Sequence, residues 1–194
     1  MEGRYRLVAG LGNPGREYAR TRHNVGFLIA DLLATRAGTA FVHDSKWNAD
    51  VARAGNLTLM KPMTFMNLSG ESVGDFCRFY KIEPSQVLVV IDDIALPLGR
   101  LRLRGTGSDG GHNGLASVLM HLGTERVPRL RVGIGSSGSK GSLVGHVLGK
   151  FSNDEQVALD DAISRAADAV EFAQESGLEA AMNRFNSNQT NIPS

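Results

Sequence analysis

The segment from Val87 to Ile91, VLVVI, constrains the fold more than any other part of the sequence because it is apolar at every position. A strand with one face in water alternates apolar and polar residues, whereas a strand covered on both faces reads as a continuous apolar run. The run ends at Asp92-Asp93. It therefore predicts a central strand of an α/β sheet, with carboxylates at the edge where ligands of open α/β sheets bind.

Apolar periodicity elsewhere predicts an alternation of strands and helices. Further strands are expected at Arg4 to Ala9, Val51 to Ala54, Leu57 to Lys61, Leu101 to Arg104 and Leu130 to Ile134. Helices are expected after His23 and at Asn67 to Tyr80, His112 to Leu122, Asp154 to Glu175 and Leu178 to Arg184. With 194 residues, 42% of them hydrophobic, the length favours one domain. We predict an α/β fold: a single domain over residues 1–186, built on a twisted mixed, mostly parallel β-sheet with helices on both faces, and then a flexible tail at 187–194.

Composition limits the cellular compartment and the binding partners that we expect for the protein. Cys77 is the only cysteine, which excludes an internal disulfide framework and fits a reducing compartment. No apolar run approaches the roughly 18 residues of a membrane span, so we expect a cytoplasmic protein without a membrane partner. The net charge is +1, but the segment from Arg100 to Lys150 carries eight basic and two acidic residues, a balance of +6. That segment could face phosphates, whereas the acidic segment from Asn153 onward is expected to be solvated.

The loop from Tyr18 to Gly26 places an imidazole, His23, just before an amphipathic run. Thr21 or Asn24 can cap the helix that follows, so His23 is held near the start of a rigid element. A histidine in such a place is a possible acid or base, and the plainer interpretation is a surface or capping histidine. The loop by itself leaves both open.

The segment from Gly10 to Gly15, GLGNPG, formally matches the G-x-G-x-x-G fingerprint of dinucleotide-binding proteins. In that fingerprint the helix begins at the glycines, whereas here the helix is expected only at about Asn24. We interpret the glycines as a tight turn that presents Asn13. An Asn-Pro pair is also an ordinary turn former, so both interpretations of Asn13 remain.

Two more loops end in asparagine at a predicted helix start. Asn67 follows Met63-Thr64-Phe65-Met66, and Asn113 follows a glycine-rich stretch and His112. Either amide could donate to a carbonyl whose oxygen becomes negative in a transition state. The asparagine-bearing loops therefore predict a polar pocket made by convergent loops, or else three ordinary helix caps.

Several common catalytic motifs do not occur. The sequence has no G-x-x-x-x-G-K-[ST], no H-E-x-x-H, no paired-cysteine metal site and no G-x-S-x-G. No metal, cofactor or covalent nucleophile is therefore expected. A histidine base, carboxylates at a strand end, amides and a basic flank remain, and they suit hydrolysis by water that an imidazole activates while an aspartate supports the ring.

Four motifs occur in one order: GLGNPG at 10–15, TRHNVG at 21–26, TFMNLSG at 64–70 and GGHNG at 110–114. With them the chain resembles the bacterial-type peptidyl-tRNA hydrolases, from Leu7 to about Phe185. The resemblance implies a monomeric, metal-free esterase that cuts the bond between a peptide and the ribose of its tRNA and so returns tRNA to translation. It implies that His23 is the general base and that Asp92 supports it. The substrate-binding residues that it implies are Asn13, Tyr18, Phe65, Met66, Asn67, His112 and Asn113.

The resemblance also gives the basic segment a role. Arg104 and Arg131 match the family's clamp on the terminal phosphate of tRNA, and Arg102 and Lys140 could extend that surface. The plainer interpretation of Arg102 and Arg104 is a solvated edge strand. Of the two adjacent carboxylates, Asp92 is expected to meet His23, since neighbouring strand residues point to opposite faces.

Two other functions stay open at this point. Relatives of the same fold in plant organelles act in RNA processing, so a non-catalytic RNA-binding protein is the first alternative. A nucleotide-dependent oxidoreductase, suggested by the glycine fingerprint alone, is the second.

Overall fold

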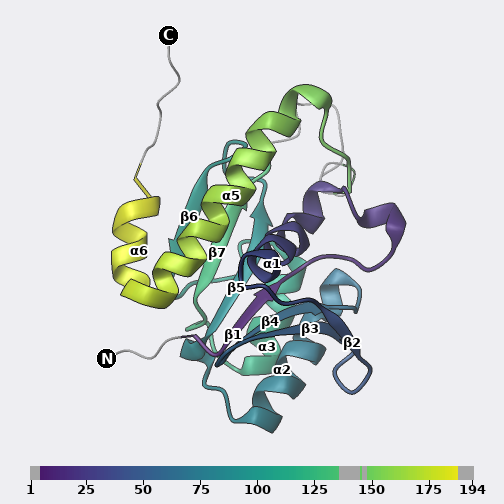
Figure 1. Ribbon diagram of the computed structural model, residues 1–194, viewed down its shortest axis with the longest axis vertical. Helices are drawn as coiled ribbons and strands as arrows, with labels where there is room; N and C mark the ends of the chain where they lie inside the picture. Colours follow the sequence, from purple (N-terminus) through teal and green to yellow (C-terminus); the bar gives the residue numbers. More distant parts are fainter. Residues whose placement is uncertain (1–4, 136–144, 146–147, 188–194) are drawn as a thin grey trace.

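The computed structural model describes residues 5–135, 145 and 148–187, and it is built around one twisted sheet of seven strands (Figure 1). The strands are β1 (Leu7–Gly10), β2 (Val42–Asp44), β3 (Ala49–Ala54), β4 (Leu57–Pro62), β5 (Val87–Asp93), β6 (Leu101–Arg104) and β7 (Arg129–Gly133). Their order across the sheet is β2-β3-β4-β1-β5-β7-β6. The four central strands β4, β1, β5 and β7 are parallel, and the outer strands pair antiparallel. The predicted mixed, mostly parallel sheet is confirmed.

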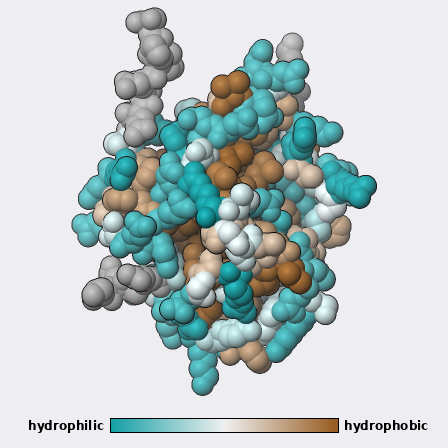
Figure 2. All heavy atoms as spheres, in the orientation of Figure 1, coloured by the Kyte–Doolittle hydropathy of each residue, from teal (hydrophilic) through white to brown (hydrophobic). Residues whose placement is uncertain are grey.

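Helices cover both faces of this sheet, as predicted (Figure 1). On one face lie α1 (Val25–Arg36), α5 (Asn153–Ser176) and α6 (Leu178–Phe185). On the other lie α2 (Ser69–Tyr80) and α3 (Asn113–Leu122). The outward side of α5 is mainly hydrophilic (Figure 2), as the amphipathic pattern requires. Among the described helices, none is long and apolar enough to cross a membrane. The predicted tail falls, from residue 188 on, outside the described residues.

The continuous apolar run of β5 lies where the sequence predicts, at the centre of the sheet. Val89 and Ile91 pack into the core under α2 and α3, and Leu88 and Val90 pack into the core under α1 and α5. None of these four side chains is more than 1% exposed. Burial on both faces explains why this strand carries no alternating pattern.

One strand escapes prediction. The three residues of β2 form an outer strand of the sheet, and Val42 is 70% exposed. A short, exposed strand has neither the length nor the alternating burial that sequence patterns report. It exists because it pairs with β3, from Val42 opposite Val51 to Asp44 opposite Ala49.

The interpretation of the loop asparagines as helix caps is wrong. Asn24 occupies the N-cap position of α1 without a capping hydrogen bond, and Thr21 Oγ1 instead donates to the carbonyl of Tyr18. Asn67 lies inside a 3₁₀ turn, Met66–Leu68, so α2 begins two residues later than predicted. Asn113 is the first residue of α3, which is capped by His112.

Gly26 determines how α1 meets the sheet. A Cβ atom on residue 26 would lie 2.6 Å from the carbonyl oxygens of both Leu11 and Val90. Only glycine permits this approach, since real Cβ contacts are never that short. The start of α1 is thereby pressed against β1 and β5, and His23, three residues earlier, reaches the end of β5.

Candidate active site

Five of the predicted site residues converge at the carboxyl edge of the parallel strands. Asn13 follows β1, and His23 lies in the 3₁₀ turn Arg22–Asn24. Met66 opens the turn after β4, Asp92 lies near the end of β5, and His112 precedes α3. Because the strands are parallel, loops distant in sequence meet at one edge.

The side chain of Asp92 joins two histidines through one oxygen. Its Oδ1 lies 2.7 Å from Nδ1 of His23 and 2.8 Å from Nε2 of His112. The backbone N–H of Leu115 donates to Nδ1 of His112 at 3.1 Å, so this nitrogen is unprotonated and Nε2 carries the hydrogen. A carboxylate only accepts, so His23 in turn donates from Nδ1 and has an unprotonated Nε2 when neutral. That Nε2 makes no hydrogen bond with any described residue.

The environment keeps Asp92 ionised. The residue is 2% exposed. Burial alone raises the pKa of the Asp92 carboxyl, but the charge and hydrogen bond of His112, followed by those of His23, outweigh it and lower the pKa from 3.8 to about 2. Asp93 points to the opposite face, where its Oδ2 lies 3.6 Å from Nη1 of Arg131. Of the two carboxylates, Asp92 is therefore the one that meets His23, as strand geometry predicts.

Asn13 is held so that its side-chain NH₂ group is available to a ligand. Its Oδ1 accepts the backbone N–H of Met66 at 2.7 Å. The carboxamide of Asn24 forms two hydrogen bonds with the backbone of Asn13. It accepts from the N–H at 2.8 Å and donates to the carbonyl at 2.9 Å. The amide orientation is thus determined by its partners, and the Nδ2 hydrogens remain for a carbonyl. The role of Asn24 in holding the backbone of Asn13 was not predicted. The only indication in the sequence is that Asn24 follows His23 in the second motif.

Of the remaining predicted substrate residues, Phe65, Asn67 and Asn113 adjoin Met66 and His112 in sequence, and Tyr18 lies in the 3₁₀ turn Arg16–Tyr18. Phe65 is 58% exposed, Asn67 and Asn113 are exposed, and Tyr18 is half-buried. The side chains of Asn67 and Asn113 make no hydrogen bond with the described part of the chain, so their amides are open to a ligand. Met66 is buried, and its sulfur occupies the space where a side chain on Gly114 would lie.

The predicted phosphate-binding arginines lie on the neighbouring strands. In the antiparallel pair of β6 and β7, Arg102 lies opposite Arg131, and Arg104 lies opposite Arg129. Their side chains therefore share one face of the sheet. Arg131 also donates to the carbonyls of Ser108 at 3.2 Å and Asp109 at 3.3 Å. The fourth predicted cation, Lys140, lies outside the described residues.

A further arginine was not singled out by the sequence. Arg129 is 1% exposed and donates to the carbonyls of Val127, Gly107 and Glu125 at 2.7, 2.9 and 3.2 Å. Burial, with the nearby charge of Arg131, lowers the pKa of Arg129 to about 10. By bonding the carbonyl of Gly107, Arg129 restrains the loop that leads to α3. Its only sequence signal is its alternation with Arg131 along β7.

The same three side chains also carry atoms that could bind a metal ion. The ligand atoms of His23, Asp92 and His112 lie within 4.8 Å of one another. The two nitrogen–oxygen distances, 2.7 and 2.8 Å, are those of hydrogen bonds, and Leu115 occupies the second nitrogen of His112. The arrangement therefore fits shared protons better than a shared cation.

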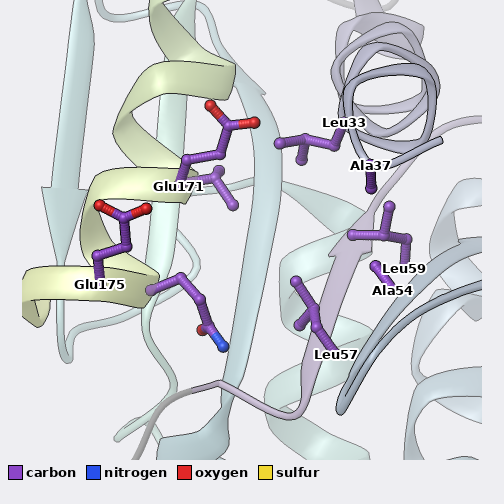
Figure 3. A pocket seen from close by; sticks show the side chains of 9 residues that line it. Leu33, Ala37, Ala54, Leu57, Leu59, Glu171 and Glu175 are labelled. Carbon is purple, nitrogen blue, oxygen red and sulfur yellow. The ribbon is translucent and has the colours of Figure 1, made fainter.

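A separate cavity of about 140 Å³ lies away from this cluster, between the end of α1, β4 and α5 (Figure 3). Leu33, Leu57 and Val170 line it, and Glu171 at its side pairs with Arg36 at 2.8 Å. It adjoins the carboxyl end of α1, whereas His23 precedes the amino end. None of the predicted site residues that the structure describes lines it.

Comparison with known proteins gives one consistent result. The sequence model of the peptidyl-tRNA hydrolase family matches residues 7–193. A peptidyl-tRNA hydrolase of Akkermansia muciniphila is 47% identical over 186 residues, which are 96% of this chain and 98% of the relative. One of Chloroflexus aurantiacus is 49% identical over 186 residues, 93% of this chain and 98% of that one. The crystal structure of peptidyl-tRNA hydrolase from Acinetobacter baumannii superposes with a TM-score of 0.88 at 41% identity, covering 94% of this chain and 95% of that chain.

Proposed function

Because the chain belongs to the peptidyl-tRNA hydrolase family, we propose that His23 is the general base of its reaction, the hydrolysis of the ester between a peptide and tRNA. The observation that carries this assignment is the 2.7 Å contact between His23 Nδ1 and Asp92 Oδ1. It leaves Nε2 as the basic nitrogen and aims it away from the carboxylate. A water molecule bound there would lose its proton to His23 as it attacks the ester carbonyl.

Asp92 would stabilise the imidazolium that forms in this step. The low pKa of its carboxyl, about 2, keeps it negative at any pH at which translation takes place. A negative charge in contact with a ring that becomes positive lowers the barrier without itself taking up the proton. His23 would then return the proton to the ribose oxygen as the ester bond breaks.

The asparagines supply donors for the substrate carbonyls. Asn67 and Asn113, both exposed, would stabilise the negative oxygen of the tetrahedral intermediate. Asn13, whose Nδ2 hydrogens are free, would bind the carbonyl of a peptide bond, which a free aminoacyl-tRNA lacks at this position. Tyr18, Phe65 and Met66 would form the wall that the peptide contacts.

The basic strands would bind the tRNA. Arg104 and Arg131 are proposed to hold its terminal phosphate, with Arg102 and Lys140 extending the surface, because guanidinium groups match phosphate geometry. We also propose that the protein is a monomer and works in the cytoplasm, where tRNA is charged. Light scattering and cell fractionation test these two points.

The experiment is release of N-acetylated amino acid from tRNA by the purified protein. His23→Ala should reduce turnover to background. His43→Ala is the matched control, because His43 also pairs with a carboxylate, Asp50 at 2.9 Å, but lies on exposed β2. The control should keep normal turnover. Near-normal turnover of His23→Ala would refute the assignment, and an inactive unmodified protein that still binds tRNA would favour the RNA-binding alternative.

A further inference from the structure

We infer that His112 is a positioning residue, a hydrogen-bond donor that is neutral at the pH of the reaction, holds Asp92 for His23 and does not itself exchange protons in catalysis or bind substrate through nitrogen. The inference rests on the proposed role of His23. Two histidines share one carboxylate oxygen here, at 2.7 and 2.8 Å, and their rings lie 4.9 Å apart between centroids. Contact with Asp92 alone does not distinguish them.

The second nitrogen of each ring makes the distinction. Nε2 of His23 has no partner among the described residues, whereas Nδ1 of His112 accepts the backbone N–H of Leu115. That N–H belongs to the first turn of α3, where backbone donors lack partners within the helix. His112 is therefore the N-cap of α3 through its ring.

This cap locks the tautomer of His112. A proton added at Nδ1 would face the N–H of Leu115, so the cap would be lost and a positive charge would stand at the positive end of the helix dipole. The hydrogen of His112 is consequently kept on Nε2, directed at Asp92. His23 has no such constraint and is free to gain and lose a proton.

The backbone around His112 makes the donor rigid. Its N–H donates to the carbonyl of Asp109 at 3.1 Å, and its carbonyl accepts from Ala116 at 2.9 Å. Its side chain is 7% exposed. Gly114 follows closely, and a Cβ there would lie 3.1 Å from the His112 ring and against the sulfur of Met66. A donor fixed by a helix start orients the carboxylate at little entropic cost.

The test separates the cap from the contact with Asp92. In His112→Asn the shorter side chain can still accept the Leu115 N–H, as asparagine does at helix starts, but it cannot also reach Asp92. In His112→Ala both interactions are lost. We expect kcat to fall about tenfold or more in both variants, because a carboxylate that is no longer held orients His23 poorly and this loss outweighs its stronger pairing with the imidazolium. KM should change less than about twofold. Only His112→Ala should show a lower melting temperature.

The pH–rate profile adds a readout that a cap alone would not change. With one donor fewer, Asp92 stabilises the imidazolium of His23 more strongly, so the acid limb of kcat/KM should move to higher pH in His112→Asn. His43→Asn, which alters the exposed histidine paired with Asp50, should leave both kcat and the acid limb unchanged. Nitrogen NMR of the unmodified protein should give His112 the signature of an unprotonated Nδ1 between pH 6 and 8.

Three results would overturn the inference. They are a normal kcat with an unmoved acid limb in His112→Asn, a rise of KM alone in that variant, or an NMR signature of a protonated Nδ1. The His23→Ala assay is run in parallel. If that variant stays active, the base assignment itself fails, whereas an inactive His23→Ala beside a normal His112→Asn refutes only the role of His112.

Discussion

Replacing Asp92 by asparagine separates the charge of the carboxylate from its geometry. In many histidine–aspartate pairs, asparagine reverses the tautomer of the histidine because its NH₂ group faces the ring. Here both histidines meet the same oxygen, Oδ1, and the tautomer of His112 requires an acceptor there. An asparagine must therefore place its own oxygen at that point, and His23 keeps Nε2 unprotonated. Only the negative charge is lost.

The size of the effect follows from the geometry. With Nδ1 and Oδ1 2.7 Å apart, the centres of the two charges are about 4 Å apart, which gives about 4 kcal/mol at an effective dielectric constant of about 20. If the ring carries about half of its charge in the transition state, about 2 kcal/mol is lost, or about 30-fold in kcat. Asp92→Ala also removes the orientation and the tautomer preference. We expect that variant to lose at least about 10³-fold.

The assay is single-turnover hydrolysis of N-acetylated aminoacyl-tRNA at 25 °C, with the folded fraction measured for each variant. Folding is checked because the new NH₂ group of asparagine finds no acceptor among the described neighbours, and a buried unpaired donor costs about 1–3 kcal/mol of stability. Equal losses in Asp92→Asn and Asp92→Ala would refute the shared-oxygen argument. So would a loss near 10⁴-fold in Asp92→Asn, which would indicate a reversed tautomer.

Four other outcomes are expected. The pKa of Asp92 in the folded protein, about 2, lies below the ordinary 3.8. This carboxylate therefore contributes about 2 kcal/mol of folding stability, which is present above about pH 4 and is lost as pH falls toward about 2. Measuring the free energy of unfolding against pH should show that loss, and Asp92→Asn should lack it. Gly114→Ala should lower kcat and melting temperature, since its methyl group would displace the sulfur of Met66; wild-type values for both would contradict the packing. Burial raises the pKa of the Cys77 thiol to about 12, so a thiol reagent at pH 8 should label only unfolded protein, and rapid labelling of folded protein would show that the site opens. If Arg131 binds a phosphate, Arg131→Gln should raise KM and flatten the dependence of log KM on log salt by about 0.7–0.9, and an unchanged slope would exclude that contact.

The amino-acid sequence determined the class of the fold and the elements that carry the site. A continuous apolar run located the buried strand β5, and an apolar period of 3.6 residues located the helices α1, α3 and α5 to within a few residues, because burial selects local sequence patterns. The order of the four motifs indicated the family. The short strand β2 was missed because an exposed edge strand imposes no such pattern.

Only the tertiary structure decided which atoms meet. Asp92 and His23 are separated by 69 positions and Asp92 and His112 by 20, and their shared oxygen results from the order of the parallel strands and the close approach of α1 at Gly26. The sequence indicated asparagine helix caps, but Asn24 bonds the backbone of Asn13, and the side chains of Asn67 and Asn113 bond no described residue. The cap of α3 is His112. A local pattern records whether a residue is buried. It does not record the partner of a hydrogen bond, because partners depend on how segments distant in sequence pack together. That packing leaves His23 available as a base and makes His112 a fixed donor.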